Sequence, residues 1–91
     1  MIVKIVDYGE INEKNFIEYD VLGLSKIQLD FLDANLDEET EIQGNVLKIK
    51  MFFEKELYPF QSDVAKFRMD DFIAREEIEM NVFLSSFLDD M

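Results

Sequence analysis

Apolar and polar residues at the N-terminal end of the chain follow patterns typical of β-strands. Residues 2–6 form an apolar run that only Lys4 interrupts, and they end at the turn-forming residues 7–9. A second apolar segment covers residues 16–22 and is closed by Gly23. The pattern therefore predicts two strands, with a turn at residues 7–9.

The segment 25–36 fits two patterns. Ser25 and Gln28 have the spacing of a helix capping box, which favours a helix. Three apolar residues instead alternate with polar neighbours, as they do in a strand: Ile27, Leu29 and Phe31. A strand is the favoured prediction and a helix is the alternative.

The clearest strand is predicted at residues 46–53, where four apolar residues share one face and lysines occupy positions between them. The four are Leu47, Ile49, Met51 and Phe53. Pro59 has no backbone N–H to donate, so residues 57–60 are predicted to be a connection. Residues 64–69 are predicted to return as a further strand, completing a hairpin.

From Asp70 onward the apolar residues have helical periodicity. At 100° per residue, eight of them fall within about 160° of one another. They are Phe72, Ile73, Met80, Phe83, Leu84, Phe87, Leu88 and Met91. Asp70 suits the N-cap of this amphipathic helix.

Four residues depart from the helical pattern. Glu76 and Glu77 fall inside the apolar sector, whereas Ile78 and Val82 fall outside it. Residues 77–84 also alternate in polarity, so a strand is the alternative for that stretch.

These elements predict a single globular α+β domain over residues 1–91, with an antiparallel sheet of about four or five strands. The C-terminal amphipathic helix is expected to pack on one face of the sheet. The predicted core residues are Ile5, Phe16, Leu29, Leu47, Ile49, Met51, Phe67, Phe83, Leu84 and Phe87.

Acidic residues are concentrated in two blocks. The chain has 21 acidic and nine basic residues, a net charge of -12. Residues 27–41 hold six acids and no base, and residues 70–91 hold seven acids and one arginine. This charge repels the phosphates of nucleic acid and favours a basic protein as the partner. A purely solubilising role of the charge is the alternative.

The predicted partner-binding residues come from both acidic blocks and from a Tyr-Pro-Phe segment between them. Tyr58 and Phe60 flank Pro59, where rigid aromatic rings suit an interface, although packing in the core is their alternative role. The predicted residues are Asp30, Asp33, Asp37, Glu38, Glu39, Glu41, Tyr58, Phe60, Glu76, Glu77 and Glu79.

The residues that most catalytic sites require are missing. The chain has no His, Cys or Trp, and no phosphate-binding loop or nucleophile elbow occurs. Asp33, Asn35 and Asp37 match the start of a calcium loop, but Glu38 and Gly44 replace its glycine and its closing glutamate. We therefore expect no enzyme activity, no metal site and no cofactor.

The predicted function is that of a small acidic protein that binds and inhibits a basic protein, such as a nuclease or another nucleic-acid-binding enzyme. Immunity proteins, antitoxins and phage anti-defence proteins, including nucleic-acid mimics, are the comparable classes. The alternatives are a viral or oligomeric structural protein, including a homodimer, and a small regulatory adaptor. The absence of cysteine and of a long apolar stretch predicts a cytoplasmic protein without membrane contact.

Overall fold

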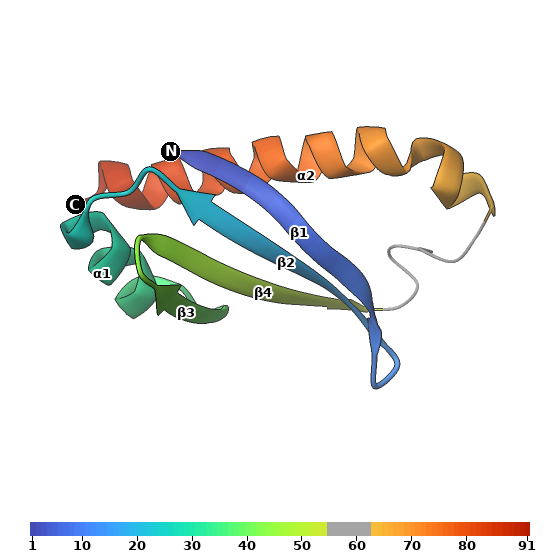
Figure 1. Cartoon of the computed structure of the whole chain (residues 1–91), viewed down its shortest axis with the longest axis horizontal. Coiled ribbons are helices and arrows are strands. Elements are labelled where there is room, and N and C mark those ends of the chain that lie inside the picture. Colours follow the sequence, from blue (N-terminus) through green and yellow to red (C-terminus); the bar gives the residue numbers. More distant parts are fainter. Residues whose placement is uncertain (55–62) are drawn as a thin grey trace.

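The computed structural model describes the backbone of residues 1–54 and 63–91, and the side chains of residues 1–53 and 70–91. Its elements are β1 (Ile2–Ile11), β2 (Lys14–Leu22), α1 (Lys26–Asn35), β3 (Glu39–Gln43), β4 (Val46–Glu54) and α2 (Asp63–Asp89). The predicted α+β class, with a C-terminal helix beside an antiparallel sheet, is confirmed (Figure 1).

The strands form a four-stranded antiparallel sheet in the order β1-β2-β4-β3. Two-residue turns close both hairpins. In the turn between β1 and β2, Asn12 and Glu13 have φ of 52° and 67°, which is the pattern of a type I′ turn. In the turn between β3 and β4, Gly44 has φ of 61° and precedes Asn45. The second pattern is that of a type II′ turn. Both turn types match the natural twist of a hairpin.

The predicted turn at residues 7–9 is wrong, because β1 continues to Ile11. The register shifts by one residue between Ile5 and Asp7, where β1 has a bulge. Such a bulge lets a strand bend without ending. The turn-forming residues at this point therefore lie within the strand.

The prediction of a strand over residues 25–36 is also wrong, and the alternative helix is present. Ser25 Oγ accepts a hydrogen bond from Gln28 N at 3.2 Å, and Gln28 Oε1 accepts one from Ser25 N at 2.9 Å. This capping box satisfies backbone groups at the start of α1. Leu29, Leu32 and Leu36 pack into the core, while Ile27 is 72% exposed.

Helix α2 begins at Asp63, so the predicted strand over residues 64–69 and the N-cap at Asp70 are both wrong. That segment contains alanine, lysine, arginine and methionine, which favour helices, and its apolar run is too short to show a period. The alternative strand over residues 77–84 is wrong as well. The predicted connection at residues 57–60 lies outside the described residues. No helix among the described residues is both long enough and apolar enough to cross a membrane.

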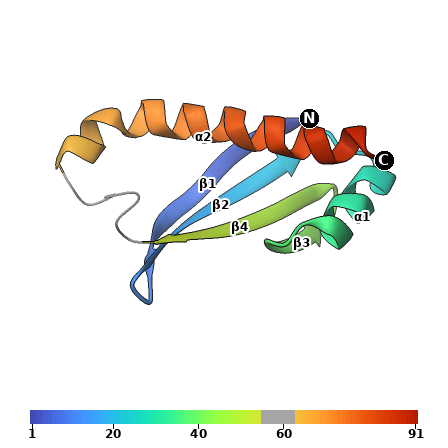
Figure 2. The same cartoon turned by 180° about the vertical axis from the view of Figure 1, so that it is seen from behind.

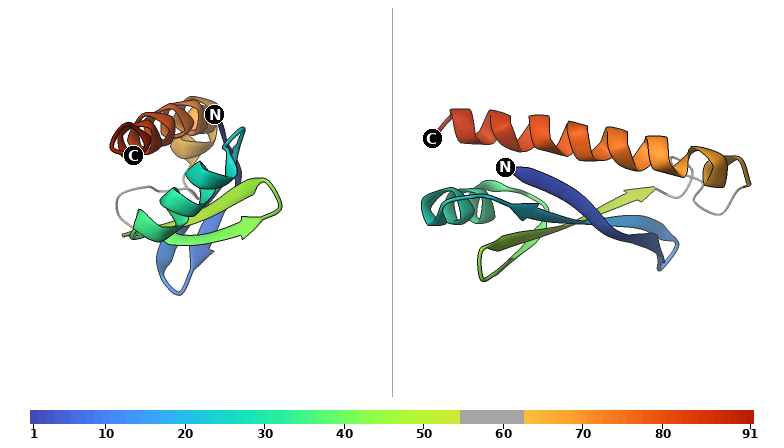
Figure 3. Two further views of the ribbon diagram at one scale, coloured as in Figure 1. Left: turned by 90° about the vertical axis from the view of Figure 1, so that its left-hand side faces the viewer. Right: turned by 45° about the horizontal axis from the view of Figure 1, so that its top comes forward.

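The core lies between one face of the sheet and the two helices (Figures 2 and 3). The central strands contribute Ile17, Tyr19, Val21, Leu47 and Ile49, all at most 1% exposed. Helix α2 contributes Met80 and Leu84. Apolar burial of this kind supplies most of the stabilisation of a small domain.

Of the predicted core residues, Leu29, Leu47, Ile49 and Leu84 are confirmed in the core. Ile5, Met51 and Phe87 are partly buried and pack against it. Phe16 is buried, but its position in β2 alternates with the core-facing residues, so it lies on the opposite face of the sheet. Phe83 is 42% exposed at the margin of the core, so its prediction as a core residue is wrong. The side chain of Phe67 lies outside the described residues.

Candidate acidic binding surface

The first acidic block, residues 27–41, is arranged around β3, which is an edge strand of the sheet. The Asp33 Oδ1 atom accepts a 2.6 Å hydrogen bond from Thr40 Oγ1, which joins α1 to β3. One turn earlier, Asp30 borders a hollow of about 310 Å³ together with Ile42 and Gly44. The acidic side of α1 therefore lies along β3 on the helix-bearing side of the sheet.

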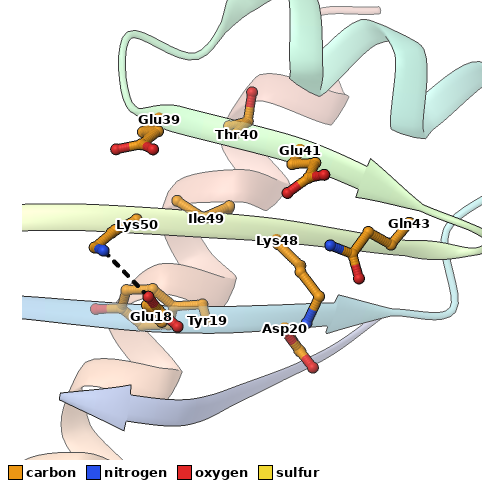
Figure 4. Close-up of a pocket in the computed structure, with 10 residues that line it drawn as sticks. All are labelled: Glu18, Tyr19, Asp20, Glu39, Thr40, Glu41, Gln43, Lys48, Ile49 and Lys50. Carbon is orange, nitrogen blue, oxygen red and sulfur yellow. Dashed lines mark hydrogen bonds and ion pairs between the residues drawn. The ribbon is translucent and has the colours of Figure 1, made fainter.

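Glu39 and Glu41 lie on the other face of β3. In the sheet register, Glu39 is opposite Lys50, and Lys50 is opposite Glu18. Glu41, Lys48 and Asp20 form an equivalent row across the same three strands. These two rows border a shallow hollow of about 560 Å³ on the face without helices (Figure 4).

Both lysines in these rows pair with β2. Lys48 Nζ lies 2.9 Å from Asp20 Oδ1, and Lys50 Nζ lies 3.3 Å from Glu18 Oε1 (Figure 4). Neither Glu39 nor Glu41 forms an ion pair within the part of the chain that the structure describes. The carboxylates of β3 are therefore exposed, without a cationic neighbour bound to them.

Aromatic rings further fix the position of Lys50. Its Nζ atom lies 5.0 Å from the ring centroid of Phe16 and 5.7 Å from that of Phe52. Contacts at this range are attractive cation–π interactions. Phe16 also packs against Gly9, where an added Cβ would come within 3.1 Å of the ring. The ammonium group of Lys50 is thus held on the β2 side of its row.

The second acidic block meets the first at Glu38. Glu38, Glu76 and Glu79 border a hollow of about 260 Å³ with apolar walls. The other residues that border it are Tyr19, Met51, Met80 and Phe83. Burial raises the pKa of Glu76, the neighbouring Glu79 carboxylate raises it further, and Arg75 acts in the opposite direction. Two segments that are distant in sequence thus form one acidic surface with an apolar centre.

Glu77 has a different role. Its Oε2 atom accepts a 2.8 Å hydrogen bond from the backbone N–H of Ile5 in β1. Glu77 is among the predicted partner-binding residues, and it departs from the helical pattern of the sequence because it falls inside the apolar sector. Asp37 is exposed in the loop before β3, and Tyr58 and Phe60 lie outside the described residues.

The residues of the partial calcium motif make contacts within α1 and β3. Asp33 is bound by Thr40, and Asn35 Nδ2 donates a 2.7 Å hydrogen bond to the Phe31 carbonyl. Within the described ranges, no group of three or more acidic side chains is arranged to hold a metal ion.

Sequence reasoning missed Glu18, Asp20, Lys48 and Lys50. One signal in the sequence could have indicated them: the two acids, like the two lysines, are spaced two residues apart on a predicted strand. Such spacing places each pair on one face. The register that sets the acids beside the lysines depends on strand pairing, which the spacing does not determine.

One protein family matches residues 2–90 of the chain, under the description "Family of unknown function (DUF5750)". No curated protein matches the chain.

Proposed function

The chain belongs to the family of unknown function (DUF5750), and we propose that it is a small non-catalytic protein that binds and inhibits a basic protein. The observation that carries this proposal is the meeting of both acidic blocks at the hollow formed by Glu38, Glu76 and Glu79. Carboxylates around an apolar centre are the features expected of a surface that binds lysine or arginine side chains.

The chemistry of the hollow suits a long cationic side chain. Met51, Met80 and Phe83 offer apolar contact to an aliphatic stem, and three acidic residues, Glu38, Glu76 and Glu79, border the same hollow. Like-charge repulsion and burial already raise the pKa of Glu76. A cation from a partner would stabilise the charged form of Glu76. The apolar walls and the carboxylates of the hollow therefore favour the same occupant, a lysine or arginine side chain.

The proposed partner is a nuclease or another nucleic-acid-binding protein. Such proteins have positively charged surfaces that bind phosphates. An acidic protein seated on that surface would exclude nucleic acid, and its net charge of -12 would speed the encounter. Inhibition would follow from competition for the surface.

Charge reversal tests this proposal. The partner is captured on the immobilised protein, eluted with salt, and its association rate measured with the purified chain. Glu76→Lys with Glu79→Lys should slow association at low salt, and the difference should shrink as salt rises. Asp89→Lys with Asp90→Lys is the matched control, because it changes the net charge equally at exposed positions near the C-terminal end of α2. Equal effects of the two pairs would mean that only total charge matters.

Assembly with further copies is the second candidate. Ile78 and Val82 lie one turn apart on the outer side of α2, and each is 65% exposed. Sedimentation equilibrium of the wild type and of Ile78→Ser with Val82→Ser tests this candidate. A dimer that dissociates in the double variant would favour assembly over binding of a basic protein.

A further inference from the structure

We infer that the partner binds by adding an extended, lysine- or arginine-rich segment to the free edge of β3. The inference rests on the proposed function for the basic character of the partner, and it specifies where and how that partner binds. β3 is the last strand in the sheet order, so its outer edge faces no other strand of the described sheet.

The two edges of the sheet differ. On β1, α2 runs alongside the strand (Figure 1), and Glu77 binds the backbone N–H of Ile5. A bulge also distorts β1 between Ile5 and Asp7. A bulge of this kind hinders the pairing of an edge strand with another chain, and the Ile5 N–H, already bound by Glu77, is not available to it. α1 lies beside β3 and contacts it through Asp33 and Thr40, but β3 has a regular register with β4 over its whole length, so it is the better template.

The turn between β3 and β4 shows which backbone groups of β3 face outward. Gln43 and Val46 flank the two-residue turn and therefore form a hydrogen-bonded pair. Because such pairs alternate along an antiparallel ladder, Thr40 and Ile42 direct their N–H and C=O groups away from β4. An added strand would bind β3 through these two residues.

Carboxylates flank this edge on both faces of the sheet. Glu39 and Glu41 lie on the face without helices. On the opposite face, Asp33 contacts Thr40, and Asp30 borders the hollow beside Ile42. Since successive side chains of a strand point to opposite faces, an added strand would meet carboxylates on both of its sides.

The occupant that this charge selects is a basic segment. In the existing sheet, Lys48 and Lys50 form their ion pairs with Asp20 and Glu18, so these lysines, although opposite Glu41 and Glu39 in the register, form no ion pair with them. A neighbouring strand with lysine or arginine would supply the ion-pair partner. A second copy of β3 would instead place glutamates beside glutamates, and like charges on adjacent strands are destabilising. A heterologous basic strand therefore fits, and a paired copy does not.

The test uses a synthetic peptide of alternating lysine and valine, seven residues long. Its twin carries the same charges but is methylated on every backbone nitrogen, so neither of its edges has a hydrogen-bond donor. Amide hydrogen exchange of the full chain is followed by NMR. In the free protein the amides of Thr40 and Ile42 should exchange faster than that of Glu41. The plain peptide should slow both outward amides by at least about tenfold, and the twin should not.

Variants establish the role of charge. Glu39→Gln with Glu41→Gln should weaken binding of the plain peptide at least about tenfold. The pair Asp89→Asn with Asp90→Asn, which removes as much charge elsewhere, should leave binding within about twofold. The inference is overturned if the two peptides bind equally, or if protection appears beside Glu76 and Glu79 while Thr40 and Ile42 stay unprotected.

The outcomes also separate this inference from the proposed function. Suppose that a captured basic protein binds the Glu76 and Glu79 reversal variant more weakly but binds the Glu39 and Glu41 variant as well as the wild type. This result would uphold the function and refute strand addition. Peptide binding at Thr40 and Ile42 without any basic protein partner would uphold the edge site and refute the function.

Discussion

Glu77 and Ile5 are joined by a hydrogen bond between residues 72 positions apart in sequence, in which the Glu77 carboxylate accepts from the Ile5 backbone N–H at 2.8 Å. The bond attaches α2 to β1 at the bulge of that strand. It also satisfies a donor that an edge strand would otherwise present to another chain. This contact is one reason why β1 and β3 differ as edges.

Removing the Glu77 carboxylate should destabilise the fold. Glu77→Ala leaves the Ile5 N–H without its acceptor, which should cost about 1–3 kcal/mol in urea unfolding. Glu77→Gln keeps an acceptor and should lose less. Glu79→Ala, at an exposed neighbouring position, should change stability by less than about 0.5 kcal/mol. Because alanine has a higher helix propensity than glutamate, propensity alone predicts no loss at either position, and equal losses at both would show that the hydrogen bond to Ile5 contributes nothing specific.

The turn between β1 and β2 holds a strained residue. Glu13 has φ of 67°, in the left-handed region that costs a side-chain-bearing residue about 1–2 kcal/mol. Glu13→Gly should therefore raise the free energy of unfolding by roughly 0.5–1 kcal/mol, with the added chain entropy of glycine offsetting part of the gain. Lys14→Gly, in the adjoining strand, should lower it. A loss of stability in Glu13→Gly would contradict the turn geometry.

The hollow at Glu76 makes stability depend on pH. Because burial and Glu79 raise the pKa of Glu76 above its ordinary 4.5, the charged form is costly in the folded state. This cost is fully present above the raised pKa and disappears as the pH falls below 4.5. Glu76→Gln should therefore melt at a higher temperature than the wild type at pH 7, and the difference should vanish in acid. A difference that is constant with pH would point to packing instead.

The two faces of α2 should respond differently to truncation. Leu84 is fully buried, so Leu84→Ala should cost about 2–5 kcal/mol. Ile78 is 65% exposed, so Ile78→Ala should stay within about 0.5 kcal/mol. Chemical denaturation measures both. A large effect of Ile78→Ala that depends on protein concentration would instead show that this face is an interface between copies.

The aromatic pair near the C-terminal end of α2 offers an intermediate case. Phe87 is partly buried and meets the Phe83 ring edge-on, with centroids 5.0 Å apart. Phe87→Ala should cost less than the 3–5 kcal/mol typical of a fully buried phenylalanine, and roughly 1–3 kcal/mol is expected in the same unfolding experiment. A loss of more than 3 kcal/mol would show that Phe87 belongs to the core proper.

The sequence by itself determined those features that depend on residues close together along the chain. The alternation in residues 46–53 predicted β4, and the helical period after Asp70 separated the inward Met80 and Leu84 from the outward Ile78 and Val82. The same period placed Glu76 and Glu77 in the apolar sector, but it also placed Phe83 there, and Phe83 is 42% exposed. Side-chain direction follows from local backbone geometry, so these assignments needed no tertiary contact.

Where local preferences conflicted, only the tertiary structure decided the outcome. In α1 the alternation of three apolar residues competed with the capping box of Ser25 and Gln28. Because β3 pairs on the far side of β4, the chain has to cross the sheet between β2 and β3. A helix makes that crossing while burying Leu29, Leu32 and Leu36. Burial in the shared core, which the segment itself does not encode, outweighed the local strand pattern.

The acidic surface was decided in the same way. Charge counts located two blocks in the sequence. Strand register placed each lysine between two acids, of which Glu18 and Asp20 form the ion pairs, and packing placed Glu38 at the same hollow as Glu76 and Glu79. Register and helix placement are set by contacts between distant segments, and the energy of burying one shared core selects among their alternatives. A sequence pattern therefore revealed which charges exist, and only the fold determined which of them are left without a partner.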